Sequence, residues 1–278
     1  MGIKIKGLQL GYFGLDYDLL VWPNPRETLN KTRREGQRVW YQCPALSYLI
    51  EHPDGRLLFE TGLSPTFKQE WLADWQQLLD LDAITPEICL ENRLKSLGLG
   101  PEDFQYVIQG HLHCDHAGGL RLFEKAGAAV VVHEDEWRYA QTIWQAENFF
   151  VRADWGFLSK EQPLLMYSDQ ELLRDVWTLS LPGHTPGTMG LLVRLDHTGW
   201  VLLPSDALNT HDTYGPPPLG APISMIPEKW GASLAKIRRI AEEKDAFLFP
   251  GHDETGVKVT QGVPEFKKIQ YLPGHTYE

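Results

Sequence analysis

Apolar and polar positions alternate through the first third of the chain, a pattern typical of strands that bury one face. The alternation is clear over residues 3–10, and the apolar segments 45–50 and 57–59 flank a turn sequence, His-Pro-Asp-Gly, at 52–55. A short turn between two such segments joins antiparallel strands. The pattern therefore predicts a β-hairpin from these two segments.

Helix and strand signals alternate in the middle of the chain. Residues 86–97 have a helical pattern with a proline in the first turn and a stop at Gly98, and a strand is predicted at 106–109. A helix at 120–126 and a buried strand at 128–133 follow.

The second half of the chain repeats this order. It predicts strands at 176–181, 191–195, 201–203 and 246–249, and an amphipathic helix with Trp230, Leu234, Ile237 and Ala241 on one face. Two β-rich halves, each followed by helices, indicate two sheets packed face to face with helices outside. No linker or short repeat interrupts the pattern, so a single domain over residues 1–278 is expected.

Residues 134–174 break the alternation with a helical and unusually aromatic segment. Its aromatic side chains include Trp137, Trp144, Phe149, Phe150 and Trp155. We expect an insertion over the functional site. The side chains could wall an apolar groove for an acyl chain, or they could serve core packing or a homodimer interface, and the sequence leaves these alternatives open.

Composition and charge argue against some classes of binding partner. The chain is 42% hydrophobic and 23% charged, with a net charge of −11 and no long basic run, so nucleic acid is not an expected partner. Three scattered cysteines do not form a disulfide framework, and no signal sequence or apolar run of the ~20 residues that span a bilayer is present. We therefore expect a cytoplasmic protein with no membrane partner.

The sequence HLHCDH at 111–116 carries the clearest chemistry. It begins where an apolar strand ends, and alternate side chains of an extended backbone point the same way, so His111 and His113 can hold one metal ion. The turn that follows directs Asp115 and His116 to a second metal, roughly 3.5–4 Å away as in two-metal hydrolases. Further ligand candidates are His184 in PGHTPG, Asp206 in LLPSDA and His252 in FPGHD.

Imidazole and carboxylate ligands suit two divalent first-row cations. Zinc fits this ligand set best, and iron, cobalt or manganese stay open. A water shared by two such cations has a pKa near ~7, so hydroxide is available for attack on a carbonyl carbon without a serine or cysteine nucleophile.

The order HxHxDH, PGHTPG, SDA and GHD resembles the metallo-β-lactamase superfamily over nearly the whole chain. This resemblance implies an α/β protein with the αβ/βα four-layer sandwich of the metallo-β-lactamase fold. Within the superfamily, the segments YVIQGHLHCDHAGGL, VVHEDEW and SDALNTHDTYGPP are similar to those of the quorum-quenching N-acyl-homoserine lactonases. The implied activity is hydrolysis of a lactone that carries an acyl chain.

The resemblance also implies a role for each ligand. His111, His113 and His184 would hold one metal, Asp115, His116 and His252 the other, and Asp206 would bridge them. Asp115 would in addition donate a proton to the leaving group.

Two positions depart from the lactonase pattern. The usual Asp-Thr-Gly after the first hairpin reads Glu60-Thr61-Gly62 here. Three residues after the bridging aspartate, where the lactonases have a tyrosine that contacts the lactone carbonyl, this chain has Asn209. We expect Asn209, the nearby Tyr214 or a metal to supply the missing oxyanion contact, unless both residues only shape the loop.

Other functions remain open at this point. A thioesterase of the glyoxalase II kind and a lactonase for a different ring share the fold and the ligands. Flavodiiron proteins and persulfide dioxygenases are oxidoreductases of the same fold, but the intact His116 and the absence of a fused flavin domain disfavour both. A non-catalytic metal-binding module is disfavoured because every ligand is retained.

Overall fold

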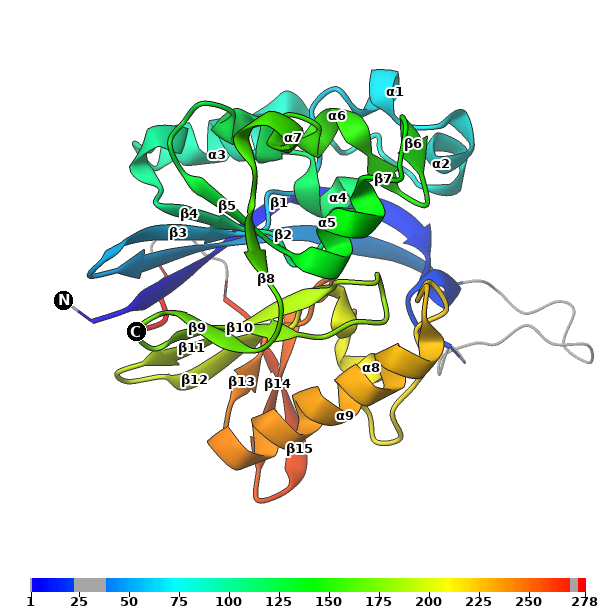
Figure 1. The fold of residues 1–278 in the computed structure, drawn as a ribbon. Coiled ribbons are helices and arrows are strands. Elements are labelled where there is room, and N and C mark those ends of the chain that lie inside the picture. The colour runs from blue at the N-terminus through cyan, green and yellow to red at the C-terminus, as the bar shows by residue number, and fades with distance from the viewer. Residues whose placement is uncertain (1, 23–38, 271–274) are drawn as a thin grey trace, which may run out of the picture.

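The computed structural model describes residues 2–22, 39–270 and 275–278. Two β-sheets lie face to face in this part of the chain, and helices cover their outer faces (Figure 1). The predicted four-layer αβ/βα sandwich is therefore confirmed.

The first sheet has the strand order β1-β2-β3-β4-β5-β8. Its strands are β1 (Lys4–Asp16), β2 (Trp40–His52), β3 (Gly55–Phe59), β4 (Tyr106–Ile108), β5 (Ala129–His133) and β8 (Leu164–Met166). The predicted hairpin is β2 and β3, which pair antiparallel with His52 opposite Gly55. From β3 onward the neighbours run parallel, so β4 and β5 end at one edge, where the ligand-bearing loop begins.

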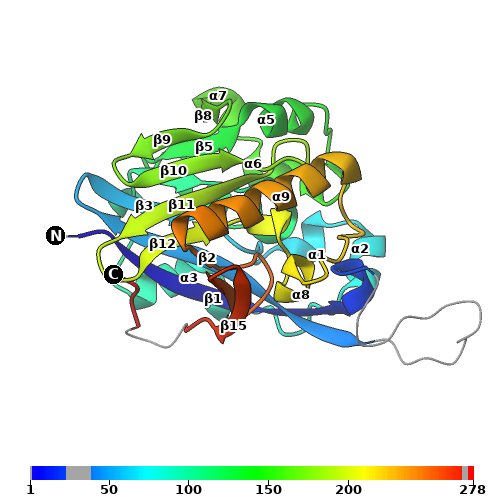
Figure 2. The same ribbon diagram turned by 90° about the horizontal axis from the view of Figure 1, so that it is seen from below.

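The second sheet has the order β15-β14-β13-β12-β11-β10-β9. Its strands are β9 (Gln170–Leu173), β10 (Val176–Ser180), β11 (Met189–Leu195), β12 (Gly199–Leu203), β13 (Phe247–Leu248), β14 (Thr255–Thr260) and β15 (Val263–Lys268). Only β12 and β13 pair in parallel among these strands of the described chain, because the long helix α9 (Pro227–Lys244) makes the crossover between them. Figure 2 shows α9 lying across the outer face of this sheet.

Strand β11 shows how the second sheet is buried on both faces. Leu191 and Val193 belong to the cluster between the two sheets, whereas Leu192 belongs to the cluster under α9. Helix α9 contributes Leu234 and Ile237 to the hydrophobic cluster beneath it, as the amphipathic pattern predicts. Both faces of β11 therefore need apolar side chains, which is why its sequence is almost continuously apolar.

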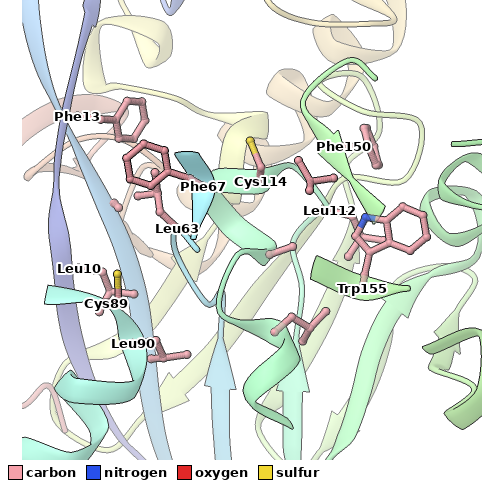
Figure 3. Packing of buried hydrophobic residues seen from close by; sticks show 14 of the residues in the cluster. Leu10, Phe13, Leu63, Phe67, Cys89, Leu90, Leu112, Cys114, Phe150 and Trp155 are labelled. Atoms are coloured by element: carbon pink, nitrogen blue, oxygen red, sulfur yellow. The ribbon is translucent and has the colours of Figure 1, made fainter. Parts of the chain in front are cut away.

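The short helices lie mainly over the first sheet. They are α1 (Phe67–Glu70), α2 (Ala73–Leu78), α3 (Leu90–Ser96), α4 (Cys114–Ala117), α5 (Glu134–Ala140), α6 (Arg152–Trp155) and α7 (Leu158–Glu161), while α8 (His211–Tyr214) precedes α9. Their buried side chains, among them Phe67, Leu90 and Trp155, form one hydrophobic cluster with Leu10 and Phe13 of β1 (Figure 3). No helix of the described residues is long and apolar enough to cross a bilayer.

Two predicted helices are shorter than the pattern suggests. The predicted helix at 86–97 is a 3₁₀ turn followed by α3, because the extended backbone of Cys89 (ψ 158°) interrupts it. The predicted helix at 120–126 is only a 3₁₀ turn, Leu120–Phe123, and the left-handed Lys125 (φ 63°) lies just beyond it.

The segment 134–174, predicted as a helical insertion, is of mixed structure. Beside α5, α6 and α7 it contains the hairpin β6 (Ala146–Glu147) and β7 (Phe150–Val151), and it supplies an edge strand to each sheet, β8 and β9. The helical prediction was wrong here because β8 pairs with β5, about 30 residues earlier in the chain, and β9 forms a hairpin with the strand β10 that directly follows the segment. Trp155 is fully buried, whereas Trp144 is 84% exposed, and the homodimer interface stays a prediction.

Arg121, in the 3₁₀ turn Leu120–Phe123, forms ion pairs with α1 and α6. Its Nη1 donates to Glu70 Oε1 at 2.7 Å, and its Nη2 donates to Asp154 Oδ1 at 2.6 Å. Asp154 is completely buried, and this burial raises the pKa of its carboxyl to about 7 although Arg121 favours the ionised form.

We expect Arg121→Met to lower the free energy of unfolding by about 2–3 kcal/mol, because it leaves a buried carboxyl without its partner. Denaturant unfolding of the purified protein measures the change. The double variant Arg121→Met/Asp154→Asn should recover part of the loss, since the neutral amide is cheaper to bury. A loss below about 0.5 kcal/mol would mean that this network is an ordinary surface ion pair.

Candidate metal centre

The ligand-bearing loop runs from the end of β4 into the short helix α4. His111 lies in the extended stretch before the helix, and His113 is the residue that caps α4, with extended backbone angles (φ −67°, ψ 152°). Asp115 and His116 lie within α4. The extended stretch therefore presents the first two histidines together, and the helical turn directs the next two side chains elsewhere, as the sequence predicts.

The first cluster consists of His111, His113 and His184. All three side chains are buried, and one ring nitrogen of each lies within 4.8 Å of the others. His184 comes from the turn after β10, and its Nε2 lies 3.0 Å from Nδ1 of His113. Three imidazoles from two distant segments thus converge on one point.

The second cluster consists of Asp115, His116 and His252. Nε2 of His116 lies 3.2 Å from Nε2 of His252, which in turn lies 3.4 Å from Oδ2 of Asp115. His252 follows β13, so this cluster joins the first sheet's loop to the second sheet.

Asp206 lies between the clusters, in the 3₁₀ turn after β12. Its Oδ2 is 3.4 Å from Nε2 of His184 and 3.2 Å from Nε2 of His252, and its Oδ1 is 3.3 Å from Nε2 of His116. The chain passes close by at Gly251, where a Cβ atom would lie 2.3 Å from Oδ1 of Asp206. One carboxylate therefore reaches both clusters.

These residues fit a pair of divalent cations. Among the described residues, Nε2 of His111 and Oδ1 of Asp206 are buried without a hydrogen-bond partner, which is costly unless another group satisfies them. Nε2 of His184 and Nδ1 of His113 also lie close together, although two neutral nitrogens without a proton between them repel. Cations placed among these atoms would remove both penalties, and imidazole and carboxylate are ligands that divalent first-row metals accept.

The electrostatics differ between the two halves of the site. Burial and the neighbouring imidazoles lower the pKa of His111 and His113 well below the usual value, and burial lowers the pKa of His184 to about 4. The first cluster is therefore neutral imidazole, the form that coordinates metals.

Acidic side chains determine the pKa values of the histidines in the second ligand cluster. Burial favours the neutral form of His116, but Asp206, Asp115 and Glu60 outweigh burial and raise the pKa of this histidine to about 10. Asp206 likewise raises the pKa of His252. The carboxylates therefore favour the binding of positive charge in this half of the site, either as protons on the histidines or as metal cations.

A mostly apolar pocket opens onto the centre. Its floor includes His113, Asp115, His184, Asp206 and His252. Its walls come from β1, the segment around α2 and two loops, and include Phe13, Leu19, Trp71, Leu79, Phe149 and Ile223. The hairpin loop of segment 134–174 is joined to the ligand loop, because Cys114 N–H donates to the carbonyl of Phe149 at 2.9 Å. Of the aromatic side chains singled out in that segment, Phe149 is the one that lines the pocket.

The sequence matches a known protein family. A family model described as the metallo-beta-lactamase superfamily matches residues 40–252. The chain belongs to this superfamily.

Several curated relatives of this chain are N-acyl homoserine lactonases. The N-acyl homoserine lactonase AiiB of Agrobacterium fabrum is 30% identical over 91% of this chain and 94% of its own length. The N-acyl homoserine lactonase AttM of Rhizobium radiobacter is 30% identical over 85% of this chain and 92% of its own. A solved quorum-quenching N-acyl homoserine lactone hydrolase superimposes with a TM-score of 0.74 at 25% identity, over 90% of this chain and 92% of the other.

Glu60 stands where the lactonase pattern has aspartate, and it contacts the metal centre from outside. Its Oε1 lies 3.2 Å from Nδ1 of His116 and accepts a 2.6 Å hydrogen bond from the hydroxyl of Ser205. The same hydroxyl lies 3.2 Å from Nδ1 of His111. Ser205 therefore orients ligands of both clusters, a role that the sequence analysis missed although this residue directly precedes Asp206.

Asn209 and Tyr214 do not line the pocket of this metallo-beta-lactamase-superfamily protein. Asn209 is buried, and its Nδ2 donates to the carbonyl of Leu20 at 3.3 Å. Tyr214 packs in the cluster under α9, with the Arg238 guanidinium 5.2 Å from its ring centre. The helical turn of α8 carries Tyr214 toward α9, so the proposed oxyanion contact from this hydroxyl is not supported by the structure.

We accordingly expect Tyr214→Phe to leave kcat within about threefold of the wild-type value, a change under ~1 kcal/mol. Steady-state kinetics on the best lactone substrate measures it. A decrease in kcat of tenfold or more, with KM unchanged, would show that the hydroxyl reaches the reacting carbonyl after all.

Proposed function

We propose that this protein is a dinuclear-metal hydrolase that opens the ring of acyl lactones, with N-acyl homoserine lactones as the expected substrates. One observation carries the proposal: two ligand clusters share Asp206 at the floor of an apolar pocket. Relatives at 30% identity that cover most of the chain are N-acyl homoserine lactonases, which supports the substrate class.

The distances support the following ligand roles. His111, His113 and His184 would hold one cation, and Asp115, His116 and His252 the other, with Asp206 contributing an oxygen to each. When bound, two divalent cations lower the pKa of a water and polarise a carbonyl oxygen. Zinc suits the ligands best in this proposal.

The apolar walls position the substrate. An acyl chain packed against Leu19, Leu79 and Ile223 would lose its contact with water and leave the lactone head at the polar floor. This placement brings the carbonyl carbon to the ligand clusters and fixes its orientation, which lowers the entropic part of the barrier.

Asp115 is suited to move a proton. Its side chain is 18% exposed, against 3% for Asp206, and it lines the pocket. His116 and His252 hold the pKa of this carboxyl below its usual range, so it is ionised. Its carboxylate can accept the proton that the attacking water releases and return it to the alkoxide oxygen when the ring C–O bond breaks. The product is the open hydroxy acid, one water heavier than the lactone.

Incubation of the purified protein with N-acyl homoserine lactones, a β-lactam and a glutathione thioester tests the proposal. Mass spectrometry should show the acyl homoserine product, formed faster than hydrolysed β-lactam. If every lactone is inert while the thioester turns over at an ordinary enzymatic rate, the thioesterase alternative replaces the proposal.

A further inference from the structure

Glu136 of α5 is completely buried next to the metal centre, yet it belongs to none of the ligand clusters. Its Oε1 accepts a hydrogen bond from the backbone N–H of Leu112 at 2.9 Å. Its Oε2 accepts from the hydroxyl of Thr185 at 2.6 Å and from the backbone N–H of Gly187 at 3.0 Å. A carboxylate buried this deeply is tolerated only because three donors satisfy it.

The three donors belong to the two segments that carry the first cluster. Leu112 lies between His111 and His113, and Thr185 directly follows His184. The two oxygens of one side chain therefore connect the ligand loop after β4 to the ligand turn after β10.

The contact between these segments is close enough to restrict the sequence. A Cβ atom at Gly187 would lie 2.2 Å from the backbone nitrogen of Glu136, so only glycine fits at the end of PGHTPG. This close approach brings the Gly187 N–H within hydrogen-bond distance of the carboxylate. The motif PGHTPG and the segment VVHEDEW thus form one structural unit.

We propose that Glu136 is a positioning residue that sets the spacing of His111, His113 and His184, and thereby the affinity of the first cation site. The proposal rests on the proposed function, in which these histidines hold a cation. The second cluster has its own supports, because Nδ1 of His116 contacts Glu60 and Nδ1 of His252 lies 3.1 Å from the carbonyl of Pro44. Loss of Glu136 should therefore weaken one cation site selectively.

Glu136→Gln is the most informative substitution because it keeps the volume of the side chain. Donors approach both oxygens, so the amide NH₂ must face at least one N–H or O–H donor in either orientation. We expect the affinity for one of two cations to fall about 10–100-fold, as is typical when a group that orients metal ligands is lost. The affinity for the other cation should change by less than about threefold.

A matched control is available on the same helix. Glu134 is partly exposed and pairs with Arg138, so Glu134→Gln makes the same chemical change away from the ligand segments. Thr185→Val removes only one of the three hydrogen bonds and should weaken the same cation site to a smaller extent. This variant tests the proposal even if Glu136→Gln does not fold.

Titration of the metal-free proteins with Co²⁺, followed by visible absorption and calorimetry, resolves the two binding steps. We expect two steps for the wild type and for Glu134→Gln, and one selectively weakened step for Glu136→Gln and Thr185→Val. If the Co²⁺ affinities of both steps in the variants match those of the wild type, this proposal alone is overturned. The same holds if both affinities fall equally and the denaturant stability of the metal-free protein falls with them. A wild type that binds fewer than two Co²⁺ ions overturns the proposed function, and this proposal with it.

Discussion

Replacing His113 by alanine or Asp206 by asparagine should reduce kcat/KM for an acyl homoserine lactone by at least about 10³-fold. His113 supplies a nitrogen to the first cluster, and Asp206 is the one carboxylate that reaches both clusters. Divalent cations contribute several kcal/mol to carbonyl hydrolysis, and each 1.36 kcal/mol is about tenfold in rate. A pH-indicator assay of ring opening measures the change.

The matched control is His197→Ala, because His197 is exposed in the turn between β11 and β12, donates its backbone N–H to the carbonyl of Glu278, and belongs to none of the ligand clusters. It should retain activity within about twofold, well under ~1 kcal/mol. Circular dichroism separates loss of function from loss of fold. A folded Asp206→Asn variant with more than a tenth of the wild-type kcat/KM would rule out the bridging role.

Lengthening the acyl chain from butanoyl to octanoyl should raise kcat/KM by roughly 10²-fold. Each buried CH₂ group contributes about 0.8 kcal/mol, and the walls of the pocket are apolar. Ile223→Asn places an amide on that wall, so it should flatten the dependence on chain length and change the rate for butanoyl least. Equal kcat/KM values for both chain lengths in the wild type would show that the chain binds elsewhere.

The sequence predicted the parts of the fold and site that local patterns specify. Alternation and apolar segments identified β1 to β5 and β10 to β13 but not β8, β9, β14 and β15, because a strand between two apolar layers needs apolar side chains wherever it is buried. The ligand motifs follow strand ends, and strand ends meet at one edge of the sandwich. The structure brings all seven ligand candidates together there.

Features set by distant contacts were not predictable in this way. Strand β8 is too short to show a period, and it exists because the distant strand β5 offers it an edge. The distance of Tyr214 from Asp206 along the chain suggested a shared site, but the turn of α8 points this side chain toward Arg238. The sequence alone indicates no role for Glu136 in the segment VVHEDEW, because its partners Leu112 and Thr185 are identified only by the fold.

The central claim is that the chain binds a pair of divalent cations and uses them for hydrolysis. Elemental analysis of the purified, active protein, combined with an assay after chelation, tests it most directly. We predict about two divalent cations per chain, loss of lactone hydrolysis after chelation, and recovery when Zn²⁺ is restored. An active preparation with one tightly bound cation or none, or with activity unaffected by chelation, would contradict the account.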